Sequence, residues 1–64
     1  MITKKDINQI TKKYGIKCVS LIKTDENKLD ITLDKNIYYK AQVEMENELF
    51  IKYPISNLFY RDII

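Results

Sequence analysis

The 64-residue sequence has no histidine and no tryptophan, and it contains one cysteine, one glycine and one proline. Without histidine the usual Ser-His and Cys-His nucleophile pairs are excluded, and one glycine cannot form a phosphate-cradling loop. Cys18 has no second cysteine to pair with, and a structural zinc site is not expected without histidine. We therefore expect a non-enzymatic protein with no cofactor and no metal.

Long apolar runs are also missing. No stretch approaches the ~20 apolar residues of a membrane-spanning helix, and residues 1–6 are too polar for a signal peptide. We therefore expect a cytoplasmic protein, in the host cytoplasm if the chain is phage-encoded. The chain is expected to be one domain, 1–64, whose core is marginal because a domain of this size buries only roughly 60% of its unfolded surface. Association, as a homodimer or with a target, would supplement that core.

The first sixteen residues carry the signals of a helix. Thr3 is placed to cap its amino terminus, with Asp6 completing a capping box, and Gly15 suits the left-handed residue that ends it. One narrow apolar stripe follows at helical spacing: Ile7, Ile10 and Tyr14.

Strict alternation of apolar and polar residues dominates the middle of the chain. It runs from 37 to 53 with a break at 45–47, and it recurs over 29–34 and, less cleanly, over 17–24. The three breaks at 25–27, 34–36 and 45–47 each end in asparagine, which favours three-residue hairpin loops. The pattern predicts an α+β fold, in which the helix packs on a four-stranded antiparallel meander with odd-numbered side chains facing inward.

The segment after Pro54 allows two interpretations. Residues 55–64 fit a short carboxy-terminal helix capped near Ser56, or a fifth strand that would make a small barrel. Lys52-Tyr53-Pro54-Ile55-Ser56 resembles the last strand and turn of Sm-like RNA-binding barrels. The glycine-bearing first motif of that family is missing between Lys28 and Leu33, so no binding residue is transferred from it.

Two features could suggest a metal site or a reactive thiol, but an ordinary structural role explains each of them better. Glu44, Glu46 and Glu48 fall near the expected third hairpin tip, where charge keeps a hairpin soluble, although carboxylates could also bind a divalent cation. Cys18 lies in a predicted strand, where a lone cysteine usually acts as a small packing residue.

Surplus apolar residues are the main functional signal. They are concentrated in the last ten positions, and a few more lie on the expected outer sheet face. Exposed apolar residues grouped in this way are typical of a protein interface. The candidate partner-binding residues are Ile22, Tyr38, Lys40, Phe50, Tyr60 and Ile64. Size, the lack of catalytic groups and a lysine-, isoleucine- and asparagine-rich composition resemble small anti-CRISPR and other host-takeover proteins. We therefore expect a phage or mobile-element accessory protein that binds and inhibits or modulates a host protein or ribonucleoprotein complex.

The alternative hypothesis is a small nucleic-acid-binding regulator. Seven lysines against three carboxylates in residues 1–28 make the amino-terminal half basic, although the net charge is only +2. Aromatic residues interleaved with lysines on a sheet face can stack single-stranded bases. The candidate residues for this alternative are Lys4, Lys5, Lys12, Lys13, Lys17, Tyr38 and Phe50.

Overall fold

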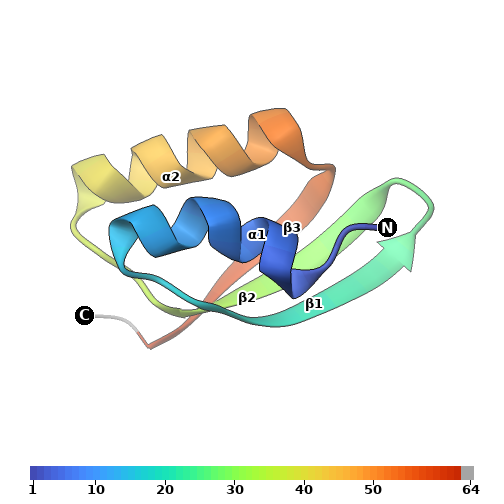
Figure 1. Ribbon diagram of the computed structural model, residues 1–64, viewed down its shortest axis with the longest axis horizontal. Coiled ribbons are helices and arrows are strands. Elements are labelled where there is room, and N and C mark those ends of the chain that lie inside the picture. The colour runs from blue at the N-terminus through green and yellow to red at the C-terminus, as the bar shows by residue number, and fades with distance from the viewer. Residues whose placement is uncertain (63–64) are drawn as a thin grey trace.

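The computed structural model describes residues 1–62 of the chain. The elements follow in the order α1 (Lys4–Thr11), the 3-10 turn η1 (Lys12–Tyr14), β1 (Cys18–Asp25), β2 (Lys28–Lys35), α2 (Tyr39–Lys52) and β3 (Ile55–Asp62). The sheet order is β1-β2-β3, with β1 antiparallel and β3 parallel to β2. Both helices lie on the same side of this sheet (Figure 1). The result is a two-layer domain in which the other sheet face is open.

The four-stranded antiparallel meander predicted from the sequence is therefore wrong. Residues 37–53 do not form a hairpin but contain α2, which crosses over from β2 to the parallel strand β3. The predicted carboxy-terminal helix is also wrong. The segment after Pro54 is a strand, yet it lies in an open three-stranded sheet and closes no barrel. The resemblance to Sm-like barrels fails with it, since Lys52 ends a helix.

Helix propensity explains why α2 forms where alternation predicted strands. The stretch 41–52 is rich in strong helix formers: Ala41, Gln42, Glu44, Met45, Glu46, Glu48, Leu49 and Lys52. Ala41, Met45 and Leu49 recur every four residues, so one side of the helix faces the sheet, and Met45 and Leu49 are fully buried. Ile51, predicted to face inward, is 88% exposed. A short apolar-rich segment satisfied both periods, and the tertiary structure selected the helical one.

The amino-terminal helix is confirmed. The Oγ1 atom of Thr3 accepts the Asp6 N–H at 3.3 Å, and a carboxylate oxygen of Asp6 accepts the Thr3 N–H at 2.8 Å. These two bonds satisfy donors that a helix start otherwise leaves free. Gly15 ends the helical stretch with a φ of 74°, a left-handed conformation that side chains resist.

The first hairpin is confirmed with a shifted register. Leu21 pairs with Ile31 as predicted, but Cys18 rather than Val19 lies opposite Leu33, because the ladder is irregular between Cys18 and Ser20. Cys18 is therefore a core residue, as its packing interpretation implied, and burial raises the pKa of its thiol. Among residues 1–62 no asparagine adopts a positive φ, so the left-handed loops expected from asparagine do not occur.

One hydrophobic core joins both helices to the sheet. It contains Ile7, Ile10, Ile16, Cys18, Ile31, Leu33, Met45 and Leu49. Because these residues come from every layer, the domain has a single cooperative interior.

Two tyrosine–glutamate hydrogen bonds fix α2 from opposite sides. Tyr14 of η1 donates its hydroxyl to Glu48 at 2.7 Å, and Lys13 forms an ion pair with the same carboxylate at 2.7 Å. On the other side, Tyr60 of β3 donates its hydroxyl to Glu46. The three glutamates thus lie along a helix and not at a hairpin tip. The part of the chain that the structure describes contains no group of three residues suited to hold a metal ion.

The Glu48 contact predicts a pH dependence. Hydrogen bonds from Lys13 and Tyr14 lower the pKa of Glu48 below the ordinary value of 4.5. Stability from a carboxylate with a lowered pKa is present above its unfolded pKa and is lost as the pH falls through the folded value. We expect the difference in unfolding free energy between wild type and Glu48→Gln to shrink as the pH falls from about 6 to about 3. Urea titrations at several pH values measure it.

The matched control is Glu44→Gln, which removes a carboxylate from the same helix without removing a hydrogen bond to Tyr14 or Lys13. A Glu48→Gln difference that stays constant over the acidic range would contradict the assigned role of this carboxylate. At the alkaline end, the bond to Glu48 raises the pKa of Tyr14 from 10.0 to about 12. The stability linked to Tyr14 is therefore present below pH 10 and is lost as the pH rises toward about 12.

Candidate interaction surface

The second helix has two apolar faces. Beside the core face, on the flank away from Glu48, Tyr39, Val43 and Phe50 share a stripe with Glu46, because their spacings are four, three and four residues. Tyr39 is 80% exposed and Phe50 47% exposed, whereas Val43 and Glu46 are half-buried. We call Tyr39, Val43, Glu46 and Phe50 the outer stripe of α2. Glu46 and the half-buried Val43 contribute to the fold, whereas the exposed surface of Tyr39 and Phe50 does not.

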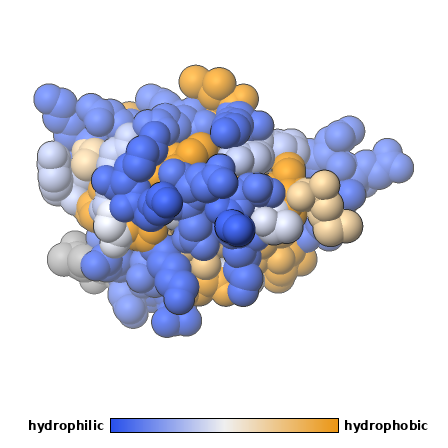
Figure 2. Space-filling view, viewed as in Figure 1, coloured by the Kyte–Doolittle hydropathy of each residue, from blue (hydrophilic) through white to orange (hydrophobic). Residues whose placement is uncertain are grey.

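The outer stripe lies over β3. Glu46 is bonded to Tyr60 of β3, whereas Glu48 on the opposite flank is bonded to Tyr14 and Lys13. The side of α2 that carries Glu46 therefore faces away from α1 and overhangs the last strand of the sheet. Figure 2 shows a group of hydrophobic atoms protruding at the top of the molecule, above α2 and among hydrophilic ones.

β3 is an edge strand of eight residues. Its sequence, Ile55 to Asp62, has no lysine and no proline, and its centre is Leu58-Phe59-Tyr60. Unpaired edges with these features are open to pairing with another strand. The other edge, β1, is protected, since Lys23 stands opposite the buried Leu29 and the ladder is irregular at both ends of the strand.

The open sheet face adds two exposed apolar side chains at different places. Phe59 lies on β3 beside Thr32, with 51% of its surface exposed. Ile22 lies on β1 beside Asp30, with 58% exposed. Phe59 therefore stands on the same edge strand that lies under the outer stripe, but on the opposite face of the sheet, whereas Ile22 stands on the other edge strand.

The structure brings some of the predicted partner-binding residues together and separates others. Tyr38, Lys40 and Phe50 lie on or next to α2 and are exposed. Tyr60 lies on β3, half-buried, with its hydroxyl held by Glu46. Ile22 lies on the far strand of the sheet, away from the others. Ile64 lies outside the described residues.

Sequence reasoning missed Tyr39, Val43 and Phe59 as members of this surface. Tyr39 and Val43 are odd-numbered positions of the expected hairpin, which were predicted to face inward, and Phe59 lies in the segment left open between a helix and a strand. The signal that finds the first two is the four-three-four spacing with Glu46 and Phe50, which appears only once the segment is taken as a helix.

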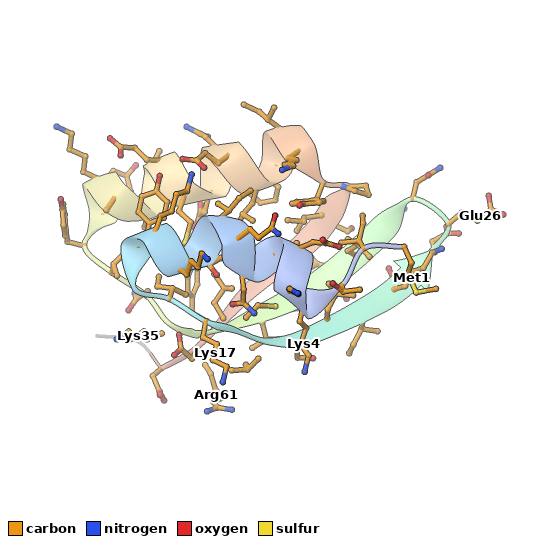
Figure 3. The ribbon with its side chains drawn as sticks, in the orientation of Figure 1. Met1, Lys4, Lys17, Glu26, Lys35 and Arg61 are labelled. Carbon is orange, nitrogen blue, oxygen red and sulfur yellow. The ribbon has the colours of Figure 1, made fainter. Side chains whose placement is uncertain are left out.

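The residues of the nucleic-acid alternative are also dispersed. Lys4, Lys5, Lys12, Lys13 and Lys17 are exposed, but Lys13 is engaged with Glu48. Figure 3 shows the side chains of Lys4, Lys17 and Arg61 pointing to one side of the molecule, away from α2. The aromatic sheet face expected from Tyr38 and Phe50 does not form. Tyr38 is the residue that precedes α2, and Phe50 lies within α2.

One small hollow in the surface lies beside the β1–β2 hairpin. It has a volume of about 410 Å³ and is lined mainly by Met1, Ile2, Leu21, Leu29 and Pro54, with Lys23 and Glu26 at its sides. It opens where the β1–β2 hairpin extends beyond the helices, and Met1 and Glu26 mark that end in Figure 3. Its lining is apolar and contains no pair of groups placed for acid–base or nucleophilic chemistry.

Among residues 1–62, no helix has the length and apolar character needed to cross a membrane. Comparisons with protein-family models, with curated proteins and with solved structures give no match to this chain. Its function must therefore be argued from the surface just described.

Proposed function

We propose that the protein is a non-enzymatic protein-interaction module that binds through the outer stripe of α2 and the adjoining edge of β3. The observation that carries this proposal is the second apolar face of α2. The helix already buries Met45 and Leu49 against the sheet, yet Tyr39 and Phe50 remain exposed on the flank that faces away from α1.

The exposed aromatic side chains of α2 are Tyr39 and Phe50. The exposed surface of these aromatic side chains adds no folding stability, and burying it in an interface releases roughly 25 cal/mol for each Å² of apolar surface. Aromatic residues are enriched at protein interfaces, where a few of them carry most of the binding energy. Val43 lies one turn from Tyr39, and Glu46, which is bonded to Tyr60, lies between Val43 and Phe50 on the same side of the helix. This combination supports a protein partner better than a solvated helix surface.

Site-specific photo-crosslinking tests the proposal. With p-benzoylphenylalanine in place of Phe50, we expect irradiation in the cell that encodes the protein to give a covalent adduct, because the probe replaces a residue inside the contact. The control places the same probe at Glu26, which is exposed in the turn between β1 and β2. Absence of an adduct at position 50, or equal adducts at both positions, would contradict a binding role for this surface.

The expectations about origin, target and cellular location stay predictions. A phage or mobile-element origin, inhibition of a host complex and a cytoplasmic location rest on composition and size. Nucleic-acid binding stays the alternative, supported by the exposed lysines of α1 and η1. It would show as binding of labelled DNA or RNA that weakens steeply with salt.

A further inference from the structure

We propose that the occupant of this surface is a second copy of the chain, joined by antiparallel pairing of β3 with β3 about a two-fold axis at Phe59. The pairing makes one continuous sheet from two three-stranded sheets, and it brings the outer stripes of the two α2 helices toward each other over the junction. The inference rests on the proposed function, because it identifies the partner of the same surface.

Backbone geometry limits the possible registers. In an antiparallel pair, a residue whose N–H and C=O point out of its sheet must face a residue of the same kind. Two identical strands meet this condition when the two-fold axis passes through a residue. The registers near the middle of β3 are therefore those centred on Leu58, Phe59 or Tyr60.

Side chains select the register centred on Phe59. It places Leu58 opposite Tyr60 on the helix-covered face, where both side chains are half-buried and pack against the core. It also places the two copies of Phe59 side by side on the open face, an aromatic pair of the kind that stabilises adjacent strands.

The neighbouring registers pair less compatible residues. Centring on Leu58 sets polar Ser56 opposite Tyr60, and centring on Tyr60 sets Leu58 opposite the carboxylate of Asp62. Each shift removes the match of apolar with apolar residues on the inner face, so the register centred on Phe59 is favoured.

Charge complementarity supports the same register. Asn57 donates its side-chain N–H to Asp30 at 2.9 Å, which leaves the amide oxygen as an acceptor beside an acidic group. Arg61 is exposed and takes part in no ion pair within residues 1–62. The register centred on Phe59 sets Arg61 of each copy opposite Asn57 of the other. The guanidinium then meets an amide oxygen and a nearby carboxylate, twice by symmetry.

The size of a standard interface sets how much surface a dimer of this chain would need. A standard interface removes about 800 Å² from each partner, against a total accessible surface of 4457 Å² for this chain. Strand pairing covers the edge of β3, and the outer stripe adds apolar area on the same side of the molecule. A two-fold axis uses this patch on both copies, which is the isologous arrangement typical of homodimers.

Disulfide trapping tests the register. In a Cys18→Ala background, we expect Phe59→Cys to form a covalent dimer under mild oxidation at micromolar concentration. The β carbons paired across the two-fold axis would lie about 5 Å apart, which a small backbone shift brings to the roughly 3.5–4.5 Å that a disulfide spans. The matched control is Ile22→Cys in the same background. Ile22 is equally exposed on the same open face, but it lies on the other edge strand. Equal or faster trapping at position 22 would overturn the proposed pairing.

Sedimentation equilibrium of the wild-type chain gives a second measurement that needs no cysteine. We expect twice the chain mass of 7.7 kDa at micromolar concentration. Arg61→Glu should weaken the dimer about tenfold or more at low salt, whereas Lys23→Glu, the same charge change on the other edge, should leave it unchanged. A monomer at all concentrations up to the millimolar range would overturn the inference.

These outcomes separate the two proposals. A monomeric protein whose probe at position 50 crosslinks to a different protein refutes the second copy and leaves the interaction module standing. A protein with no adduct at position 50 and no dimer refutes both. A trapped Phe59→Cys dimer whose position-50 adduct has twice the chain mass supports both.

Discussion

Replacing Leu49 with alanine is expected to lower the free energy of unfolding by about 2–5 kcal/mol, whereas Ile51→Ala should change it by less than about 0.5 kcal/mol. Leu49 is fully buried between α2 and the sheet, and its truncation leaves a cavity. Ile51 stands two residues further along and is 88% exposed, so its truncation removes almost no buried surface. The contrast follows from the helical period alone.

Urea unfolding followed by circular dichroism measures both variants. In a hairpin the two residues would share the inner face, and both substitutions would then be costly. An Ile51→Ala variant as destabilised as Leu49→Ala would therefore contradict α2. Because a small domain has only a few kcal/mol to lose, Leu49→Met provides a milder variant that should stay folded, at a cost below about 1.5 kcal/mol.

Proline at Asn47 is expected to destabilise the fold by about 3 kcal/mol or more, whereas alanine there should stabilise it by up to about 0.7 kcal/mol. Asn47 is an exposed residue in the middle of α2. Proline removes an intrahelical hydrogen bond and clashes with the preceding turn, while alanine has the higher helix propensity. Two substitutions at one exposed position should thus act in opposite directions.

Thermal unfolding of the Asn47 variants provides the measurement, with the far-ultraviolet helix signal as a second readout. If residues 45–47 formed a hairpin loop, alanine would replace a residue suited to turns and would lower stability. A decrease in melting temperature for Asn47→Ala, or a Pro variant that melts like wild type, would therefore contradict the helix.

Local signals predicted the first helix, whose two ends are specified by capping residues and by a glycine. Thr3 and Asp6 specify where α1 starts, and Gly15 specifies where the helical stretch stops, because capping bonds and a positive φ each need particular residues. The pairing of Leu21 with Ile31 followed from alternation on both sides of a short loop. These features depend on neighbours within about fifteen residues, so the chain alone specifies them.

The candidate surface was predicted only in part. Phe50 and Lys40 were recognised as surplus to the core, and both lie exposed on α2. Their association with Tyr39 and Val43 depends on the helical period, and the neighbourhood of Phe59 depends on β3 being an edge. Neither the helical period of α2 nor the edge position of β3 can be predicted from an alternating apolar pattern.

The sequence by itself determined a capped first helix, a β1–β2 hairpin with Ile31 and Leu33 facing inward, and an excess of apolar residues in its second half. The tertiary structure decided that 39–52 is a helix and that β3 pairs parallel to β2. The reason is that the local pattern of 37–53 suits both a strand pair and a helix. Long-range contacts, from Met45 and Leu49 to the sheet and from Tyr60 to Glu46, act together with the helix propensity of 41–52 to select the helix.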